Sequence, residues 1–197
     1  MQDGVIQLGE AHRAAVVATL AAAFQDDPAI SWMIPDPAER RRRLPRMYDW
    51  LVDDHLRHGI ILGTPDGAAV TMWRLPGKVH HHDRLWPPLL WRLLRIFGMN
   101  LGRAATVGDA IGAHVPAGED YYYLRYAGVQ PASQGQGLGG KVIRAGLALA
   151  ATQGRPACLE TATPENVGIY LRLGFTVVEE WDVPRGGPQF WTMVRGV

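Results

Sequence analysis

The sequence predicts a single α/β domain of mixed α+β character, in which helices pack around a central mixed sheet. Three observations support this prediction. The 197 residues are enough for one domain with a full core. Neither a repeat nor a linker-like composition divides the chain. Between residues 121 and 195, β-prone apolar runs alternate with helix-forming segments.

The first third of the chain predicts a strand and two helices. Residues 4–8 alternate enough in polarity for a first strand, and the Ala-rich segment 10–27 is strongly helix-forming. Asp36 is expected to be the N-cap of a second helix, with a proline at the first helical position, and Gly59 can end that helix. Pro45 lies inside it and is expected to kink or split it.

The middle of the chain predicts a β-hairpin followed by helix. The turn-forming stretch "TPDG" (64–67) separates two β-prone runs, 60–63 and 68–74, which indicates antiparallel strands. Residues 77–119 are expected to hold one or two helices with Trp and Leu on one face. This segment includes "HHHD" (80–83), but adjacent residues of an extended chain point in alternate directions, so no metal site is expected.

The C-terminal half has the clearest pattern. Thr163 is expected to be the N-cap of the last helix, followed by a proline, and Gly174 is expected to end it. The pattern predicts strand 121–129, helix 141–154, strand 157–162, helix 163–174 and strands 175–183 and 188–195.

Composition and charge exclude several classes of partner. With 20% charged residues and a formal net charge of +1, the chain is not expected to bind nucleic acid. Its single cysteine, Cys158, fits a reducing compartment. The first ten residues lack the pattern of a secretory signal, and the apolar stretch 14–24 is too short to cross a bilayer. We therefore expect a cytoplasmic protein without a membrane partner, either a monomer or a homodimer.

The glycine-rich stretch "QGQGLGG" (134–140) can be parsed in two ways. From Gly135 it reads G-x-G-x-x-G, the dinucleotide-binding fingerprint, and Glu160 lies twenty residues after Gly140, where a ribose-binding acid belongs. From Gln134 it reads Q-x-x-G-x-G, which places several backbone amides at a helix N-terminus and suits a pyrophosphate.

The surrounding chain favours the second parse. The segment 130–134 separates the end of the strand at Val129 from the first glycine, which is too long for the tight dinucleotide turn. Residues 141–197 leave no room for a second mononucleotide-binding half. An NAD(P)-binding oxidoreductase is therefore the weaker alternative.

The stretches "YLRYAGVQPASQGQGLGGKVI" and "LETATPENVGIYLRLGF", within about residues 122–181, resemble the GNAT N-acetyltransferase superfamily. Apolar strand, proline, Q-x-x-G-x-G, acid-ended strand, Asn and Y-x-x-L-G-F are specific in combination. "AAAFQDDP" and "GGPQFWTMVR" further resemble its puromycin N-acetyltransferase branch. The resemblance implies one GNAT-like domain over residues 1–197. Its mostly antiparallel mixed sheet would be splayed at the middle strands and would hold acetyl-CoA as co-substrate.

The resemblance also implies a role for each matching residue. The strand end 127–129 would lend backbone groups to the pantetheine arm, and the amides of 135–140 would hold the pyrophosphate. Asn166 would touch the coenzyme, Tyr170 would protonate the departing thiolate, and Glu160 would act as base or substrate ligand. The expected coenzyme-binding residues are Ala127, Gly128, Val129, Gln134, Gly135, Gln136, Gly137, Leu138, Gly139, Gly140 and Asn166.

The expected reaction is direct transfer of the acetyl group to a primary amine of a small molecule in a ternary complex. Alkylammonium groups have a pKa near ~10.4, so a base must remove a proton, either Glu160 or a water relay. A backbone amide near Val129 is expected to stabilise the oxyanion. Cys158 lies in an apolar strand and is expected to be inert.

Two questions stay open at this stage. The chain could be a non-catalytic acyl-CoA-binding sensor, although the presence of both Glu160 and Tyr170 favours an enzyme. The acceptor amine is not defined by the sequence, and neither is the part that His114 and the segment 77–119 play in binding it.

Overall fold

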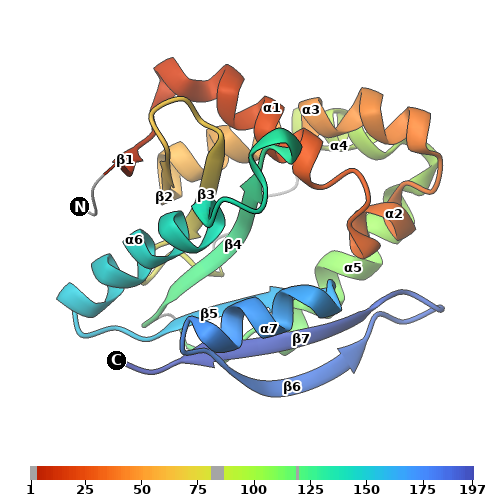
Figure 1. Cartoon of the computed structure of the whole chain (residues 1–197). Coiled ribbons are helices and arrows are strands. Elements are labelled where there is room, and N and C mark those ends of the chain that lie inside the picture. Colours follow the sequence, from red (N-terminus) through yellow and green to blue (C-terminus); the bar gives the residue numbers. More distant parts are fainter. Residues whose placement is uncertain (1–3, 81–86, 119) are drawn as a thin grey trace.

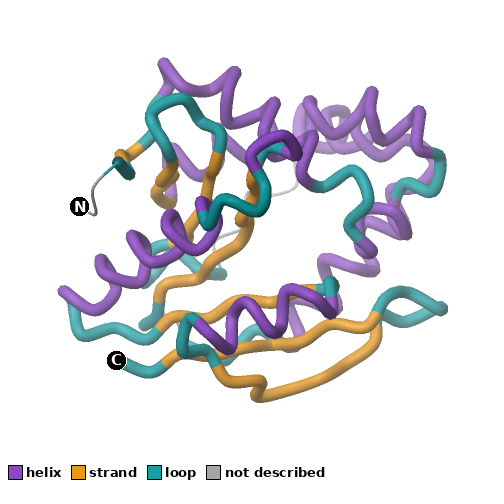
Figure 2. Tube along the Cα trace, in the orientation of Figure 1, coloured by secondary structure: helices purple, strands orange, loops and turns teal. Residues whose placement is uncertain are grey.

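A seven-stranded mixed sheet runs through the protein, with helices on both faces (Figures 1 and 2). The structure is a computed structural model, and it describes residues 4–80, 87–118 and 120–197. The described strands are ordered β1-β2-β3-β4-β5-β7-β6, and their neighbouring pairs are antiparallel except for β4 and β5. The predicted fold class, a helix-flanked and mostly antiparallel mixed sheet, is confirmed.

The described strands, helices and 3₁₀ turns have the following bounds. The strands are β1 (Ile6–Gln7), β2 (Gly59–Gly63), β3 (Ala69–Arg74), β4 (Tyr122–Val129), β5 (Ala157–Thr161), β6 (Thr176–Asp182) and β7 (Gln189–Arg195). The helices are α1 (Arg13–Ala23), α2 (Pro28–Met33), α3 (Pro37–His58), α4 (Pro87–Phe97), α5 (Leu101–His114), α6 (Leu138–Thr152) and α7 (Pro164–Arg172). Three 3₁₀ turns complete the set: η1 (Glu10–His12), η2 (Gly98–Asn100) and η3 (Pro131–Ser133).

The two faces of the sheet carry separate cores. Side chains of α1 to α5 form one cluster around Leu20, Leu44 and Tyr48, all fully buried. Side chains of α6 and α7 form the other around Trp73, which is also fully buried. In Figure 1, α6 and α7 lie in front of the sheet. Among the described residues, no helix is long and apolar enough to span a bilayer.

The middle of the sheet is splayed. β4 and β5 pair only where Tyr122–Leu124 lie beside Ala157–Leu159. Beyond that point β4 stays with β3 as far as Val129, and β5 stays with β7 as far as Thr161, so the two strands diverge (Figure 1). The register of β4 against β3 also skips Arg125, which marks a β-bulge where the divergence begins.

Helix α3 is continuous from Pro37 to His58, so Pro45 does not split it. Pro45 is exposed, and the hydrogen bond that it cannot donate is lost on the solvent side of the helix. The opposite face buries Leu44, Met47 and Leu51, and this packing holds the helix across the proline.

Helix α2 was missed, because Pro28 was interpreted as the end of the preceding helix. It is instead the first residue of a new one, whose N-cap Asp27 accepts a hydrogen bond from the Ile30 amide at 2.9 Å. The helix predicted from residue 141 begins at Leu138, after Gly137 in a left-handed conformation. The described part of the segment 77–119 holds two α-helices, and of "HHHD" only His80 is described.

Gly146 allows α6 to pack directly on β3. A Cβ at this position would lie 2.2 Å from the indole of Trp73. Replacing Gly146 by Ala should therefore lower the free energy of unfolding by about 1–3 kcal/mol, because the buried indole has no room to move. Urea denaturation of the two proteins measures this difference.

The matched control is Gly102→Ala in α5, where an added Cβ meets no described atom within 4 Å. This variant should be neutral or slightly more stable, since alanine has the higher helix propensity. Equal effects of the two substitutions would contradict the packing argument.

Candidate active site

A cavity of about 480 Å³ opens where β4 and β5 diverge. The bulged end of β4, the end of β5 and one face of α7 form one side of it, and α2, α4 and α5 form the other. Its lining includes four residues predicted from the sequence: Glu160, Asn166, Tyr170 and Ala127 of β4. Residues separated by more than forty positions in the sequence are thus brought to one site.

The glycine loop lies between the end of β4 and the start of α6 (Figure 2). Gly135 and Gly137 have φ angles of 77° and 75°, in the left-handed region that favours glycine. The first helical hydrogen bond runs from the Lys141 amide to the Gly137 carbonyl, so the amides of 138–140 have no partner within the helix. A Cβ on Gly135 or Gly137 would meet no described atom within 4 Å, so the loop faces open space.

Gln134 contributes to the loop through its side chain. Its amide nitrogen Nε2 donates to the carbonyl oxygen of Val129 at 3.3 Å and so ties the loop to the end of the strand. Gly128 has a different part: a Cβ there would lie 2.9 Å from Leu20, so this glycine lets α1 pack closely on β4. The predicted roles of residues 127–129 and 134–140 in coenzyme binding remain predictions.

Tyr170 projects from α7 into the cavity and is 9% exposed. Its ring contacts Phe175 edge-on at 5.9 Å. Burial, with a contribution from the charge of Asp27, raises the pKa of the phenol to about 12. The hydroxyl is therefore protonated at neutral pH and can donate a proton or a hydrogen bond.

Glu160 ends β5 at the wall of the cavity. Tyr123 hydrogen-bonds to its carboxylate, and the Cys158 thiol lies 3.8 Å from Oε1. Its other oxygen, Oε2, is buried and has no hydrogen-bond partner among the described residues. Burial raises the pKa of Glu160 to about 7. The two hydrogen bonds lower it, but they offset only part of the effect of burial. Such a carboxylate is well matched to proton transfer at neutral pH.

Asp27 is a cavity carboxylate that the sequence analysis missed. It lines the cavity from the start of α2, and its charge acts on the phenols of Tyr170, Tyr126 and Tyr48. Burial raises its pKa, although backbone amides and the Thr163 side chain partly oppose that effect. The signal was an Asp followed by Pro, the same helix-start pattern that located Asp36.

A buried charged cluster supports the bulge of β4. The carboxylate of Asp54 accepts hydrogen bonds from Arg74 and, at 3.1 Å, from Arg125. Burial alone would raise the pKa of Asp54, but the guanidinium groups of Arg125 and Arg74 lower it. Burial and the same two cations lower the pKa of the neighbouring His55 to about 3, so this ring is neutral. The cluster holds Arg125 at the edge of the cavity.

Two other residues singled out from the sequence are not among the described residues that line the cavity. Cys158 is buried, and burial raises the pKa of its thiol far above the ordinary value, as expected of an inert cysteine. His114 stacks on Trp181 with ring centroids 4.3 Å apart, and its Nδ1 lies 2.9 Å from Glu179. It is not among the described residues that line the cavity.

The chain is similar to known acetyltransferases in sequence and in fold. No protein-family model matches it. An uncharacterised N-acetyltransferase of Schizosaccharomyces pombe is 28% identical over 170 residues, which cover 80% of this chain and 68% of that protein. A crystal structure from Corynebacterium glutamicum, described as histone acetyltransferase HPA2 and related acetyltransferase, superposes with a TM-score of 0.75 at 22% identity and covers 100% and 98% of the two chains.

The chain has the fold of the GNAT N-acetyltransferases. Arylalkylamine N-acetyltransferase 2 of Aedes aegypti has the same GNAT fold, with a TM-score of 0.65 at 14% identity over 98% of this chain and 97% of that one. The polyamine N-acetyltransferase of Drosophila melanogaster does too, with a TM-score of 0.64 at 13% identity over 98% and 99%. The alternative dinucleotide interpretation is wrong, because that fold needs a mostly parallel sheet and β4–β5 is parallel alone among the described pairs.

The raised pKa of Glu160 has a consequence for stability. Between its ordinary value of 4.5 and about 7, the unfolded chain ionises Glu160 while the folded chain keeps the proton. The free energy of unfolding should therefore fall as the pH rises through this window, by about 3 kcal/mol from this residue. Glu160→Gln removes this component. Urea denaturation at several pH values should therefore show that the free energy of unfolding of the variant rises relative to that of the parent protein as the pH increases.

Glu165→Gln is the control, since Glu165 is exposed in the first turn of α7. Its pH dependence should match that of the parent protein. A constant difference between the parent protein and Glu160→Gln across the window would contradict the assignment.

Proposed function

We propose that the chain transfers the acetyl group of acetyl-CoA directly to the primary amine of a small molecule with an apolar body. One observation carries the proposal: a single cavity holds a protonated phenol and three carboxyl groups, those of Glu160, Asp27 and Asp109, beside a slot with a helix N-terminus at its mouth. Acetyl-CoA would supply a thioester that an uncharged amine can attack. Residues of this chain would bind the coenzyme, remove a proton from the amine and protonate the departing sulfur.

The splay provides the place for the coenzyme. Beyond Leu124, the edge of β4 that faces β5 pairs with no described strand, so its backbone groups are available to a ligand with amide groups of its own. Ala127, Gly128 and Val129 lie on this edge, and the free amides of 138–140 follow it at the start of α6. We assign the pantetheine arm to the first group and the pyrophosphate to the second.

Proton removal from the amine falls to a carboxylate of the cavity. Glu160 is suited to this step because its pKa of about 7 lets it accept a proton at neutral pH. Asp27 faces the same cavity beside Tyr170, where its negative charge attracts an ammonium group and helps to keep the phenol protonated. We assign Glu160 as the base, Asp27 as the ligand of the amine and Tyr170 as the donor to the departing sulfur.

Tyr170→Phe tests the enzymatic role. The variant should lower kcat by about 100-fold, because it removes a general acid, and should leave the affinity for acetyl-CoA unchanged. Release of the free thiol of coenzyme A measures the rate, and isothermal titration measures the affinity. Tyr121→Phe is the control, since its hydroxyl donates to the Pro116 carbonyl at 2.9 Å, and it should keep full activity.

Three outcomes separate the competing functions. Tight binding of acetyl-CoA without thiol release for any amine of a broad panel would identify a sensor domain. Tight binding of NADH without binding of coenzyme A would overturn the proposal entirely. Unchanged kcat in Tyr170→Phe would remove the phenol from the mechanism.

The far side of the cavity defines the class of acceptor. Helices α2, α4 and α5 present an apolar wall that includes Ile30, Met33, Phe97 and Ile111. Glu160 lies at the opposite side, at the end of β5, and the charge of Asp27, at the start of α2, acts on Tyr170. An amine with one cationic end and an apolar body therefore fits both kinds of surface. An arylalkylamine has this shape, whereas a polyamine would need Asp109 of α5, which also lines the cavity, to pair with its second charge.

The stretches that resemble the puromycin N-acetyltransferase branch lie at this part of the cavity. "AAAFQDDP" supplies Phe24 and Asp27, and "GGPQFWTMVR" supplies Phe190. This supports placing the chain near that branch, and it fits an acceptor with a bulky apolar group.

Gly108 offers a test of the acceptor class. It lines the cavity from α5, and a Cβ there would meet no described atom within 4 Å. Gly108→Leu should therefore fill part of the cavity and displace the apolar body of a bulky acceptor from it. The KM for a phenylethylamine should rise by about tenfold or more, because that body loses apolar contact area with the protein. The KM for a short alkylamine should stay unchanged, as measured by thiol release.

Gly102→Leu is the matched control, because Gly102 is on the same helix with equally open space and is not among the described lining residues. It should leave both KM values unchanged. An equal rise for the bulky and the short amine in Gly108→Leu would show that α5 does not contact the acceptor body.

A further inference from the structure

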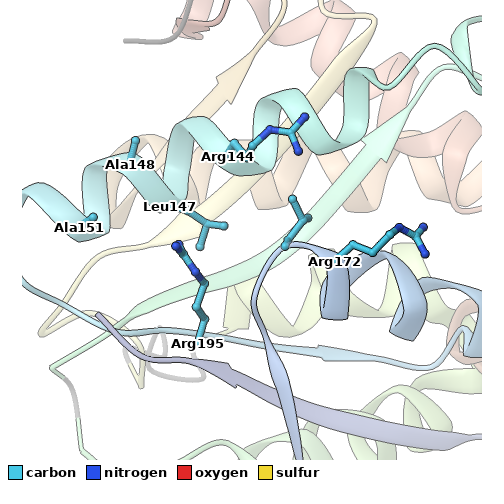
Figure 3. Close-up of a pocket in the computed structure, with 7 residues that line it drawn as sticks. Arg144, Leu147, Ala148, Ala151, Arg172 and Arg195 are labelled. Carbon is cyan, nitrogen blue, oxygen red and sulfur yellow. The ribbon is translucent and has the colours of Figure 1, made fainter.

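A second pocket, of about 310 Å³, lies outside the cavity, in the groove between α6 and the end of α7 (Figure 3). Leu147, Ala148 and Ala151 form its apolar floor on α6, with Leu173 opposite. Three arginines surround it, Arg144 of α6, Arg172 of α7 and Arg195 at the end of β7.

The three arginines carry positive charge without a counter-charge. Among the described residues, none of their guanidinium groups forms an ion pair or a hydrogen bond, and no Asp or Glu lines this pocket. Elsewhere in the chain, arginines are commonly paired: Arg13 bonds Glu10 and Asp53, and Arg43 bonds Glu39. Three unpaired guanidinium groups around one depression favour an anion, and their planar donors suit a phosphate.

The arginine side chains place this charge next to the glycine loop. The guanidinium of Arg144 folds back over the first turn of α6, 3.4 Å from where a Cβ of Gly140 would be. The guanidinium of Arg172 turns back along α7, 3.6 Å from the corresponding position of Gly168. Figure 3 shows both groups directed toward the same end of the groove. Arg144 is one helical turn, about 5.4 Å, beyond Gly140.

We infer that this pocket binds the phosphate monoester on the 3′ position of the ribose of coenzyme A, with Arg144 and Arg172 as its principal ligands. The inference rests on the proposed function. The amides of 138–140 can hold the pyrophosphate as one anionic site, and the coenzyme carries a second, separate one, the phosphate monoester on its ribose. The arginine pocket adjoins the first site and has the charge and the donors that the second phosphate needs.

The inference makes the 3′-phosphate the feature by which the chain selects its coenzyme. A coenzyme without this phosphate would still reach the slot and the loop amides, and it would lose the ion pairs with the arginines. The expected signature is therefore a difference in affinity between two forms of the coenzyme, with no change in the chemistry of transfer.

Isothermal titration with coenzyme A and with 3′-dephospho-coenzyme A tests this directly. The parent protein should bind coenzyme A about tenfold or more tightly, and added salt should reduce the difference. In the double variant Arg144→Gln, Arg172→Gln, the affinity for coenzyme A should fall to that for the dephospho form, which itself stays unchanged. Arg46→Gln, on the exposed side of α3, is the control and should keep the full preference.

The outcomes distinguish this inference from the proposed function. Equal affinity of the parent protein for the two forms overturns the phosphate site and leaves the proposed function intact. Equal weakening of both forms in the double variant also overturns it, because the arginines would then act on the shared part of the coenzyme. Failure of the parent protein to bind either form overturns the proposed function as well.

Discussion

The arrangement of the site depends on the early end of hydrogen bonding between β4 and β5. Three residue pairs join the two strands, and beyond Leu124 and Leu159 each strand is held only by its outer neighbour. The backbone groups that face the slot must then be satisfied by water or by a ligand, since buried peptide groups without partners are costly. The fold keeps the slot open by fastening each strand on its other side.

On the outer side of β4, aromatic contacts and an ion pair hold the strand in place. Tyr126 contacts Phe24 and Tyr48 edge-on, with ring centroids 5.6 Å and 5.5 Å apart, so the bulged end of β4 is supported from α1 and α3. Asp54 of α3 bonds Arg125 at the bulge itself. Among the described residues, Glu160 on the opposite strand has hydrogen bonds only from a phenol and a thiol, so burial raises its pKa, whereas cations lower the pKa of Asp54. The pKa values of these two buried carboxyl groups thus shift in opposite directions because their neighbours differ.

The sequence predicted best what local interactions decide. In the C-terminal half, the N-cap Thr163, the stop at Gly174 and the β-prone runs are all read from a few adjacent residues, and the elements lie where they were expected. Tyr170, Glu160 and Asn166 were selected because they stand in one linear motif, and they do line one cavity.

What the sequence did not predict depends on contacts between distant segments. Asp27 joins the site only because α2 packs against α5 and beneath the splay, and nothing near it in sequence marks a carboxylate as functional. The small residues of α5 carry no reactive group, so their role in lining the cavity could not be predicted from the sequence. Pro45 does not split α3, and only the packed structure shows that its missing hydrogen bond faces solvent.

The glycines of α5 carry a further consequence. Gly108 and Gly112 lie within α5, line the cavity and leave open the space that a Cβ would occupy. Each lowers the stability of the helix by about 1 kcal/mol relative to alanine. The open wall is thus maintained against the intrinsic preference of the helix, so thermostability and the range of bulky acceptors should trade off against each other at these two positions.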